Sequence, residues 1–139
     1  MKICILYGGD SLERNISLKT GQAIYDSINK QHKVFLYDFN GNYESLSENI
    51  CKVDLVFNAL HGGNGENGTV QRFLENKGVR FTGSDSSASA KAMDKNIAKL
   101  ICKEHDIPTP HWVMASAEDI NSEELQELYV NNYTWKAAG

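Results

Sequence analysis

The chain has 139 residues, 41% hydrophobic and 23% charged, which is the balance of an ordinary globular protein rather than a disordered one. Its formal net charge of −4 gives no electrostatic basis for binding nucleic acid or an anionic membrane. No apolar run approaches the roughly 20 residues of a membrane span, and no secretory signal is evident, so we expect a cytoplasmic protein. The three cysteines are widely spaced, which favours inert, mostly buried thiols over a zinc site or a disulfide framework.

The N-terminal part of the chain predicts a strand followed by a crossover helix. Lys2–Tyr7 is an apolar run closed by two glycines, which is typical of a strand buried on both faces of a parallel sheet. Glu13–Asn29 is long enough for a helix, and we expect Asp10 or Ser11 to cap its start. Two further strands are predicted at Lys33–Phe39 and Asp54–Leu60.

The middle of the chain continues the alternation of strands and helices. A glycine-rich stretch, His61–Gly68, leads into a predicted helix at Thr69–Asn76. A short strand at Val79–Thr82 and a long helix at about Ser87–His105 follow. This order predicts an α/β fold of three layers, in which a mostly parallel sheet of about four strands carries helices on both faces.

A pair of prolines, Pro108 and Pro110, predicts a domain boundary. We therefore expect a first domain over residues 1–109 and a short stub of a second domain over residues 110–139.

Three loops follow predicted strands and are expected to form one site, since ligands of open parallel sheets bind beyond the carboxyl ends of the strands. Glu13 offers a carboxylate to an ammonium group, whereas Arg14 and His61 are candidates for binding a carboxylate. Two plainer interpretations stay open: Glu13 and Arg14 as a solvated first-turn pair, and His61 as a structural histidine. The loops are Gly8–Arg14, His61–Gly68 and Gly83–Ser86.

The stretch Gly63–Gly68 also matches the dinucleotide fingerprint GxGxxG, and Asp85 lies near where a ribose-binding acid is expected. The fingerprint normally occupies the first strand-to-helix turn, however, and here it follows the third predicted strand. Asn64 and Glu66 also make the loop polar and crowded. A dinucleotide-binding domain stays an alternative interpretation.

Three motifs stand at the ends of predicted strands and the starts of the helices that follow: Leu6–Ser17; Phe57–Gly62 with Gly65–Gln71; and Phe81–Ser84 with Ser87–Ala90 and Met93–Lys95. Together they resemble the motifs of the D-alanine–D-alanine ligases, which belong to the ATP-grasp superfamily. They occur in the family's order, and the resemblance covers about residues 2–112. It implies a Rossmann-like, pre-ATP-grasp domain followed by the start of the central ATP-grasp domain.

The resemblance also implies an activity. The family uses ATP to phosphorylate the carboxylate of one D-alanine, and the amine of a second D-alanine attacks the acyl phosphate to give a dipeptide for peptidoglycan. ATP and Mg²⁺ are the implied cofactors, with the metal ligands expected beyond residue 139. Two D-alanine molecules are the implied partners, and a homodimer through the N-terminal domain is expected. We expect the isolated chain to be inactive, and a stand-alone small-ligand-binding domain is the alternative.

The resemblance assigns the substrate residues. Glu13 would bind the ammonium of the first D-alanine, and His61 would lie near its carboxylate as the second catalytic residue. Ser11 and Gly62 would be further substrate-binding residues.

For ATP, the resemblance assigns Lys95, which would stabilise phosphate charge. Lys136 resembles a second ATP lysine, although Ala137 follows it where the family usually has proline, so a coincidental match or an artificial tail stays an alternative interpretation. Asn15 and Asn67 stand where acidic residues are usual, so we expect looser local caps or ion pairs there.

Overall fold

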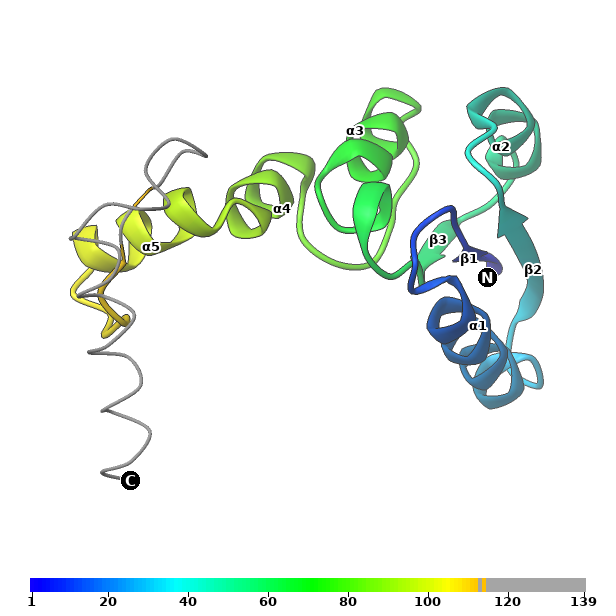
Figure 1. Cartoon of the computed structure of the whole chain (residues 1–139). Coiled ribbons are helices and arrows are strands. Elements are labelled where there is room, and N and C mark those ends of the chain that lie inside the picture. The colour runs from blue at the N-terminus through cyan, green and yellow to red at the C-terminus, as the bar shows by residue number, and fades with distance from the viewer. Residues whose placement is uncertain (113, 115–139) are drawn as a thin grey trace. The chain divides into compact units, whose positions relative to one another are not determined.

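A computed structural model describes residues 1–112 and 114 (Figure 1). The chain divides into two compact units, Met1–Ala98 and Lys99–Gly139. The predicted domain boundary after residue 109 falls within the second unit and stays a prediction. Within the described residues, no helix is long and apolar enough to cross a membrane.

The first unit is built on a parallel sheet with the strand order β2-β1-β3. The strands are β1 (Lys2–Gly8), β2 (Lys33–Phe39) and β3 (Leu55–Asn58). In the central strand β1, Ile3 pairs with Val34 on one side and with Leu55 on the other. The predicted parallel α/β fold is confirmed.

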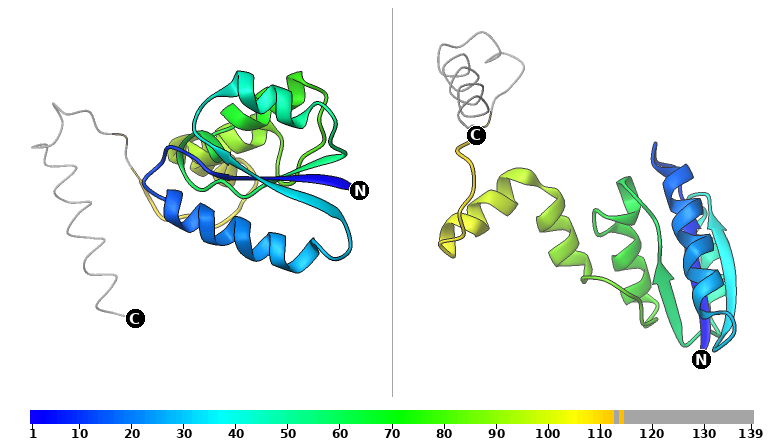
Figure 2. Two further views of the ribbon diagram at one scale, coloured as in Figure 1. Left: turned by 90° about the vertical axis from the view of Figure 1, so that its right-hand side faces the viewer. Right: turned by 90° about the horizontal axis from the view of Figure 1, so that it is seen from below.

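Helices cover both faces of this sheet (Figures 1 and 2). Helix α1 (Arg14–Ile28) lies on one face, while α2 (Tyr43–Ile50) and α3 (Thr69–Asn76) lie on the other. Alternate residues of each strand therefore enter different cores, which explains why β1 is apolar throughout. The core beneath α2 and α3 includes Cys4, Leu6, Val56, Leu46, Ile50, Val70 and Leu74.

On the opposite face, α1 approaches β1 closely. A Cβ atom placed on Gly21 would lie 2.6 Å from Tyr7 Cβ, so the close approach requires glycine at this position. The face that α1 buries carries Ser17 and Gly21, both small, while Ile16 is exposed.

Helix α2 was not predicted. The helix is short, so its sequence pattern is weak. The side chain of Asn42 caps it by accepting a hydrogen bond from the Ser45 N–H (3.0 Å), and Leu46 and Ile50 form a single buried pair one turn apart.

The predicted fourth strand at Val79–Thr82 is reduced to a single bridge between Phe81 and Val56. Two backbone hydrogen bonds join it to β3, from the Val56 N–H to the Arg80 carbonyl and from the Thr82 N–H to the Val56 carbonyl. Gly78 precedes it and Gly83 follows it, both with positive φ, so the extended segment is short.

The predicted long helix is divided in two, α4 (Ser86–Met93) and α5 (Lys95–Glu104). Asp94 between them is extended, and its carboxylate accepts hydrogen bonds from the N–H groups of Asn96 (2.9 Å) and Ile97 (3.0 Å). Asp94 therefore acts as the N-cap of a new helix. Its negative charge is also stabilised by the positive end of the helix dipole.

The cysteines differ from one another in environment. Cys4 is buried, and desolvation raises the pKa of its thiol to about 12. Cys102 is partly buried, and Cys51 is exposed, so the prediction of mostly buried thiols is wrong for Cys51.

Candidate functional site

The first candidate loop joins β1 to α1. Gly8 and Gly9 have φ values of 87° and 86°, and they reverse the chain after the strand. Arg14 then donates two hydrogen bonds to the carboxylate of Asp38 (2.7 and 2.6 Å) and one to the Gly9 carbonyl (3.1 Å). The hydrogen bond with Asp38 is the main cause that raises the pKa of Arg14. Arg14 is thus already paired within the protein, which disfavours it as a ligand for a substrate carboxylate.

The same loop presents Glu13 and Ser11. Glu13 is the N-cap residue of α1, but its side chain makes no capping bond and its carboxylate is exposed. The Ser11 hydroxyl accepts from the Glu13 N–H (3.1 Å) and donates to the His61 carbonyl (2.5 Å). The predicted cap by Asp10 or Ser11 is therefore wrong, because Ser11 joins the first loop to the second instead.

The second loop follows β3 and is held from within by two side-chain amides. Asn58 donates from Nδ2 to the Gly65 carbonyl (3.0 Å) and accepts at Oδ1 from the Leu60 N–H (3.2 Å). Gln71 of α3 donates from Nε2 to the same Gly65 carbonyl (2.8 Å). The loop contains a short 3₁₀ helix at Gly63–Gly65, so it has a defined shape before any ligand binds.

His61 lies at the start of this loop with both ring nitrogens near polar groups. Its Nε2 is 3.0 Å from the Thr20 hydroxyl on α1, and its Nδ1 is 4.0 Å from a carboxylate oxygen of Glu66. The His61 side chain is 33% exposed and that of Glu66 45%. The ring is therefore oriented by the protein and still reachable by a small ligand.

The two loops meet at Gly62 and Glu13. Gly62 has a φ of 68°, and a Cβ atom there would lie 2.5 Å from Glu13 Oε2, so only glycine allows the two to approach. A carboxylate, a hydroxyl, an imidazole and open backbone are thus gathered at the carboxyl ends of β1 and β3. The structure brings together all the residues expected at the substrate: Glu13, Ser11, His61 and Gly62.

The third loop adjoins the second. A cleft of about 420 Å³ lies beside the end of β3; both loops line it, with Gly65 and Glu66 from the second and Gly83 and Ser84 from the third. Its other walls are formed by α4 and by residues near β3.

Glu75 of α3 anchors the third loop. Its carboxylate accepts from the Ser86 N–H (2.8 Å) and from the Ser86 hydroxyl (2.5 Å). These bonds, led by the one from the hydroxyl, lower the pKa of Glu75.

This geometry weakens the dinucleotide interpretation of Gly63–Gly68. Gly65 is buried beside the Leu60 side chain, and its N–H group already donates to the Gly62 carbonyl (3.1 Å), so it is not available to a pyrophosphate. Asp85 is the N-cap of α4, where its Oδ1 accepts from the Ala88 N–H (2.7 Å). The acid expected on a ribose is thus engaged in capping a helix.

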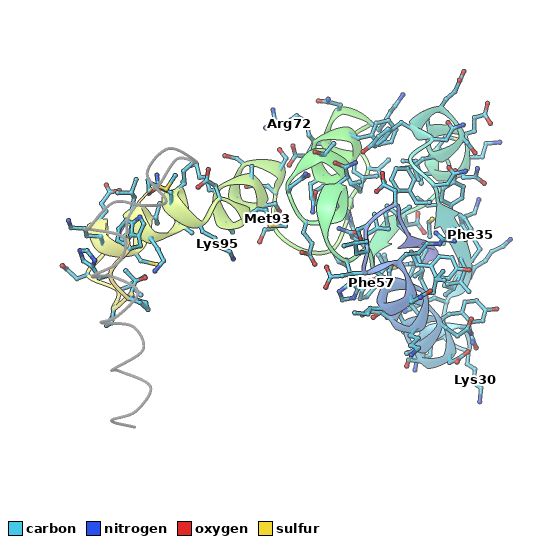
Figure 3. All side chains as sticks on the ribbon, in the orientation of Figure 1. Lys30, Phe35, Phe57, Arg72, Met93 and Lys95 are labelled. Atoms are coloured by element: carbon cyan, nitrogen blue, oxygen red, sulfur yellow. The ribbon has the colours of Figure 1, made fainter. Side chains whose placement is uncertain are left out.

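Of the two lysines expected at ATP, Lys95 is the first residue of α5 (Figure 3). Its side chain is exposed, and its ammonium makes no ion pair with the described residues. Lys136 lies outside the described residues. Across residues 1–112 and 114, no group of three or more His, Cys, Asp or Glu side chains could hold a metal ion.

Several residues of the site were not predicted in these roles, among them Thr20, Asp38, Asn58, Glu66 and Gln71. Thr20 could have been predicted, since it lies two helical turns after Glu13 and therefore on the same face of α1.

Asn67, which was expected to loosen a local cap, still accepts from the Thr69 N–H (3.0 Å) through its Oδ1, so that local bond to the start of α3 is kept.

Sequence comparisons identify relatives of this chain. The family described as D-ala D-ala ligase N-terminus matches residues 40–84. The D-alanine–D-alanine ligase of Vesicomyosocius okutanii is 44% identical over 118 residues, which are 84% of this chain and 40% of that protein. The chain thus spans about two fifths of the length of the curated relative.

Solved structures agree with the sequence comparisons. A D-alanine–D-alanine ligase from Bacillus anthracis in complex with ATP aligns with a TM-score of 0.80 and 34% identity, covering 91% of this chain and 42% of that one. The VanG D-Ala:D-Ser ligase of Enterococcus faecalis aligns with a TM-score of 0.73 and 26% identity, covering 94% and 49%. In sequence and in fold, the chain corresponds to the N-terminal part of the D-alanine–D-alanine ligase family.

Proposed function

We propose that the protein containing this chain is an ATP-dependent D-alanine–D-alanine ligase, and that the chain forms the wall of the site for the first D-alanine. One observation carries the proposal: in a chain related to these ligases, the Glu13 carboxylate lies against Gly62, next to His61. A carboxylate and an imidazole on neighbouring loops suit the two ends of a small zwitterion.

The reaction has two steps. A carboxylate oxygen of the first D-alanine attacks the γ-phosphorus of ATP, and ADP leaves. The amine of the second D-alanine then attacks the acyl carbon, so that an amide bond forms, phosphate leaves and the amine loses a proton. The dipeptide would serve peptidoglycan synthesis in the cytoplasm.

In this proposal Glu13 binds the ammonium of the first D-alanine by charge and hydrogen bonding, and so fixes the position of its carboxylate. Thr20 donates its hydroxyl proton to Nε2 of a neutral His61, which leaves the ring proton on Nδ1. That N–H group is then available to the substrate carboxylate, with Glu66 stabilising the ring whenever it is charged. Ser11 holds the two loops at the required separation.

Lys95 suits the triphosphate of ATP. Its ammonium makes no ion pair with the described residues and can balance phosphate charge, and we propose Lys136 as the second lysine. Mg²⁺, when bound, would neutralise phosphate charge, but the described residues supply no ligand cluster for it, so its ligands are expected elsewhere in the protein.

The partners of the proposed enzyme are two D-alanine molecules. The similarity to a D-Ala:D-Ser ligase makes D-serine the natural competitor for the second position. We also propose a homodimer formed through this part of the protein.

The proposal is tested by measuring phosphate release by the intact protein with ATP and either D-alanine or L-alanine. Release is expected with D-alanine only. Glu13→Gln, which keeps the shape and removes the charge, should lower kcat/KM for D-alanine by about 100-fold. Glu48→Gln changes an exposed glutamate on α2 in the same way and should have no effect. Normal turnover of Glu13→Gln would overturn the role of Glu13.

The 139-residue chain alone is expected to release no phosphate from ATP in the presence of D-alanine. Turnover by the pure chain would contradict our assignment of the remaining ATP-binding and metal-binding groups to other parts of the protein.

A further inference from the structure

The Gly65 carbonyl accepts two side-chain hydrogen bonds, one from Asn58 and one from Gln71. A carbonyl oxygen has two lone pairs, so both amides bind it at full strength. Gly65 itself is buried, with no room for a side chain beside Leu60.

The Asn58 amide also closes the loop. Its Oδ1 accepts from the Leu60 N–H, just before His61, while its Nδ2 donates to the Gly65 carbonyl, just before Glu66. One side chain thus binds the residue directly before His61 and the residue directly before Glu66. The positions of both functional side chains depend on it.

Glutamine at position 71 lowers the stability of the fold and so needs a reason other than stability. It is 5% exposed, and its Oε1 has no hydrogen-bond partner among the described residues. A buried acceptor without a partner lowers stability, whereas a methionine of similar shape would have no such polar atom. The hydrogen bond that Gln71 donates to Gly65 is therefore kept at the expense of stability.

We infer that Asn58 and Gln71 are positioning residues that set the His61 ring and the Glu66 carboxylate for substrate binding. The inference rests on the proposed function for its catalytic consequence, but not for its structural one. Both act through the Gly65 carbonyl, to which each donates a hydrogen bond.

The test uses Asn58→Asp, Gln71→Met and the double variant. Asn58→Asp keeps the acceptor for the Leu60 N–H and puts a carboxylate oxygen against the Gly65 carbonyl. Gln71→Met removes both the donor and the unpaired acceptor, so its unfolding midpoint should stay close to that of the wild type.

Two matched controls remove the same groups elsewhere. Asn49→Asp deletes an amide donor to the Ser45 carbonyl on α2, and Gln22→Met deletes the donor to Asp26 on α1.

The first readout is the ring NMR signals of His61 in the 139-residue chain, followed through a pH titration. The two single variants should shift these signals and the double variant should shift them further, whereas the controls should leave them unchanged. The second readout is turnover of the intact protein. Each single variant should lower kcat/KM for D-alanine about 10-fold, and the double variant about 100-fold.

The outcomes separate the two proposals. Unchanged His61 signals in a folded Gln71→Met chain, together with unchanged turnover of the intact variant, would overturn the positioning role. An intact wild-type protein without ligase turnover would overturn the proposed function, while the His61 signals would still decide whether the amides position the ring.

Discussion

The two loops that form the candidate site are held in opposite ways. The loop after β1 is anchored at the surface by the ion pair of Arg14 with Asp38, whose side chains are 40% and 45% exposed. The loop after β3 is anchored by the side-chain amides of Asn58 and Gln71, which both donate to the carbonyl of the buried Gly65.

The difference indicates a division of roles between the loops. An exposed ion pair contributes little to stability and weakens in salt, so the loop bearing Glu13 can adjust when a substrate arrives. Hydrogen bonds from neutral amides to the carbonyl of a buried glycine are insensitive to salt, so the loop bearing His61 is set before binding. The structure thus combines one adaptable wall with one preorganised wall.

The largest expected effect tests the rigid loop. Gly65→Ala should lower the free energy of unfolding by about 3 kcal/mol, because its Cβ would overlap the buried Leu60 side chain. Gly63→Ala is the matched control: its Cβ would lie 3.6 Å from Ser11 Cβ, and only the φ of 48° costs about 1 kcal/mol. Urea unfolding measures both. Equal losses would show that Gly65 is not tightly enclosed.

A smaller effect tests the surface anchor. Arg14→Gln should lower the unfolding midpoint in dilute buffer, because the paired guanidinium and its bond to the Gly9 carbonyl are lost. The difference from the wild type should shrink in about 1 M salt, which screens the exposed pair. Gln71→Met should show no such salt dependence. A salt-independent loss for Arg14→Gln would mean that packing, rather than charge, holds the first loop.

The smallest expected effect concerns the third loop, which a carboxylate anchors. The pKa of Glu75 is lowered in the folded protein, so its contribution is present above its unfolded pKa, near 4.5, and is lost as pH falls through the folded value. Glu75→Gln should therefore differ from the wild type in unfolding midpoint at neutral pH, and the difference should diminish below pH 4.5. A difference that stays constant down to acidic pH would contradict the assignment.

The sequence supported the larger features because burial leaves a clear pattern. The apolar run at the start of β1 predicted a strand covered on both faces, and the predicted helix Thr69–Asn76 has the observed bounds. Short or polar features gave weaker signals. Helix α2 buries only Leu46 and Ile50, and Asp94 has the appearance of an exposed acid although it begins a new helix.

Within the site, the residues assigned by resemblance could be placed, whereas the residues that hold them could not. Asn58 and Gln71 donate to a backbone carbonyl, and no pattern in the sequence predicts which carbonyl a side-chain amide will bind. The ion pair of Arg14 with Asp38 likewise depends on β1 and β2 lying side by side, which fixes the distance between residues far apart in the chain.

The central claim is that Glu13 and His61 together bind the first D-alanine. A crystal structure of the intact protein with D-alanine and a non-hydrolysable ATP analogue tests it most directly. We expect the D-alanine ammonium within hydrogen-bonding distance of the Glu13 carboxylate, and the D-alanine carboxylate beside the His61 ring. D-alanine bound away from both residues, or in the reverse orientation, would contradict it.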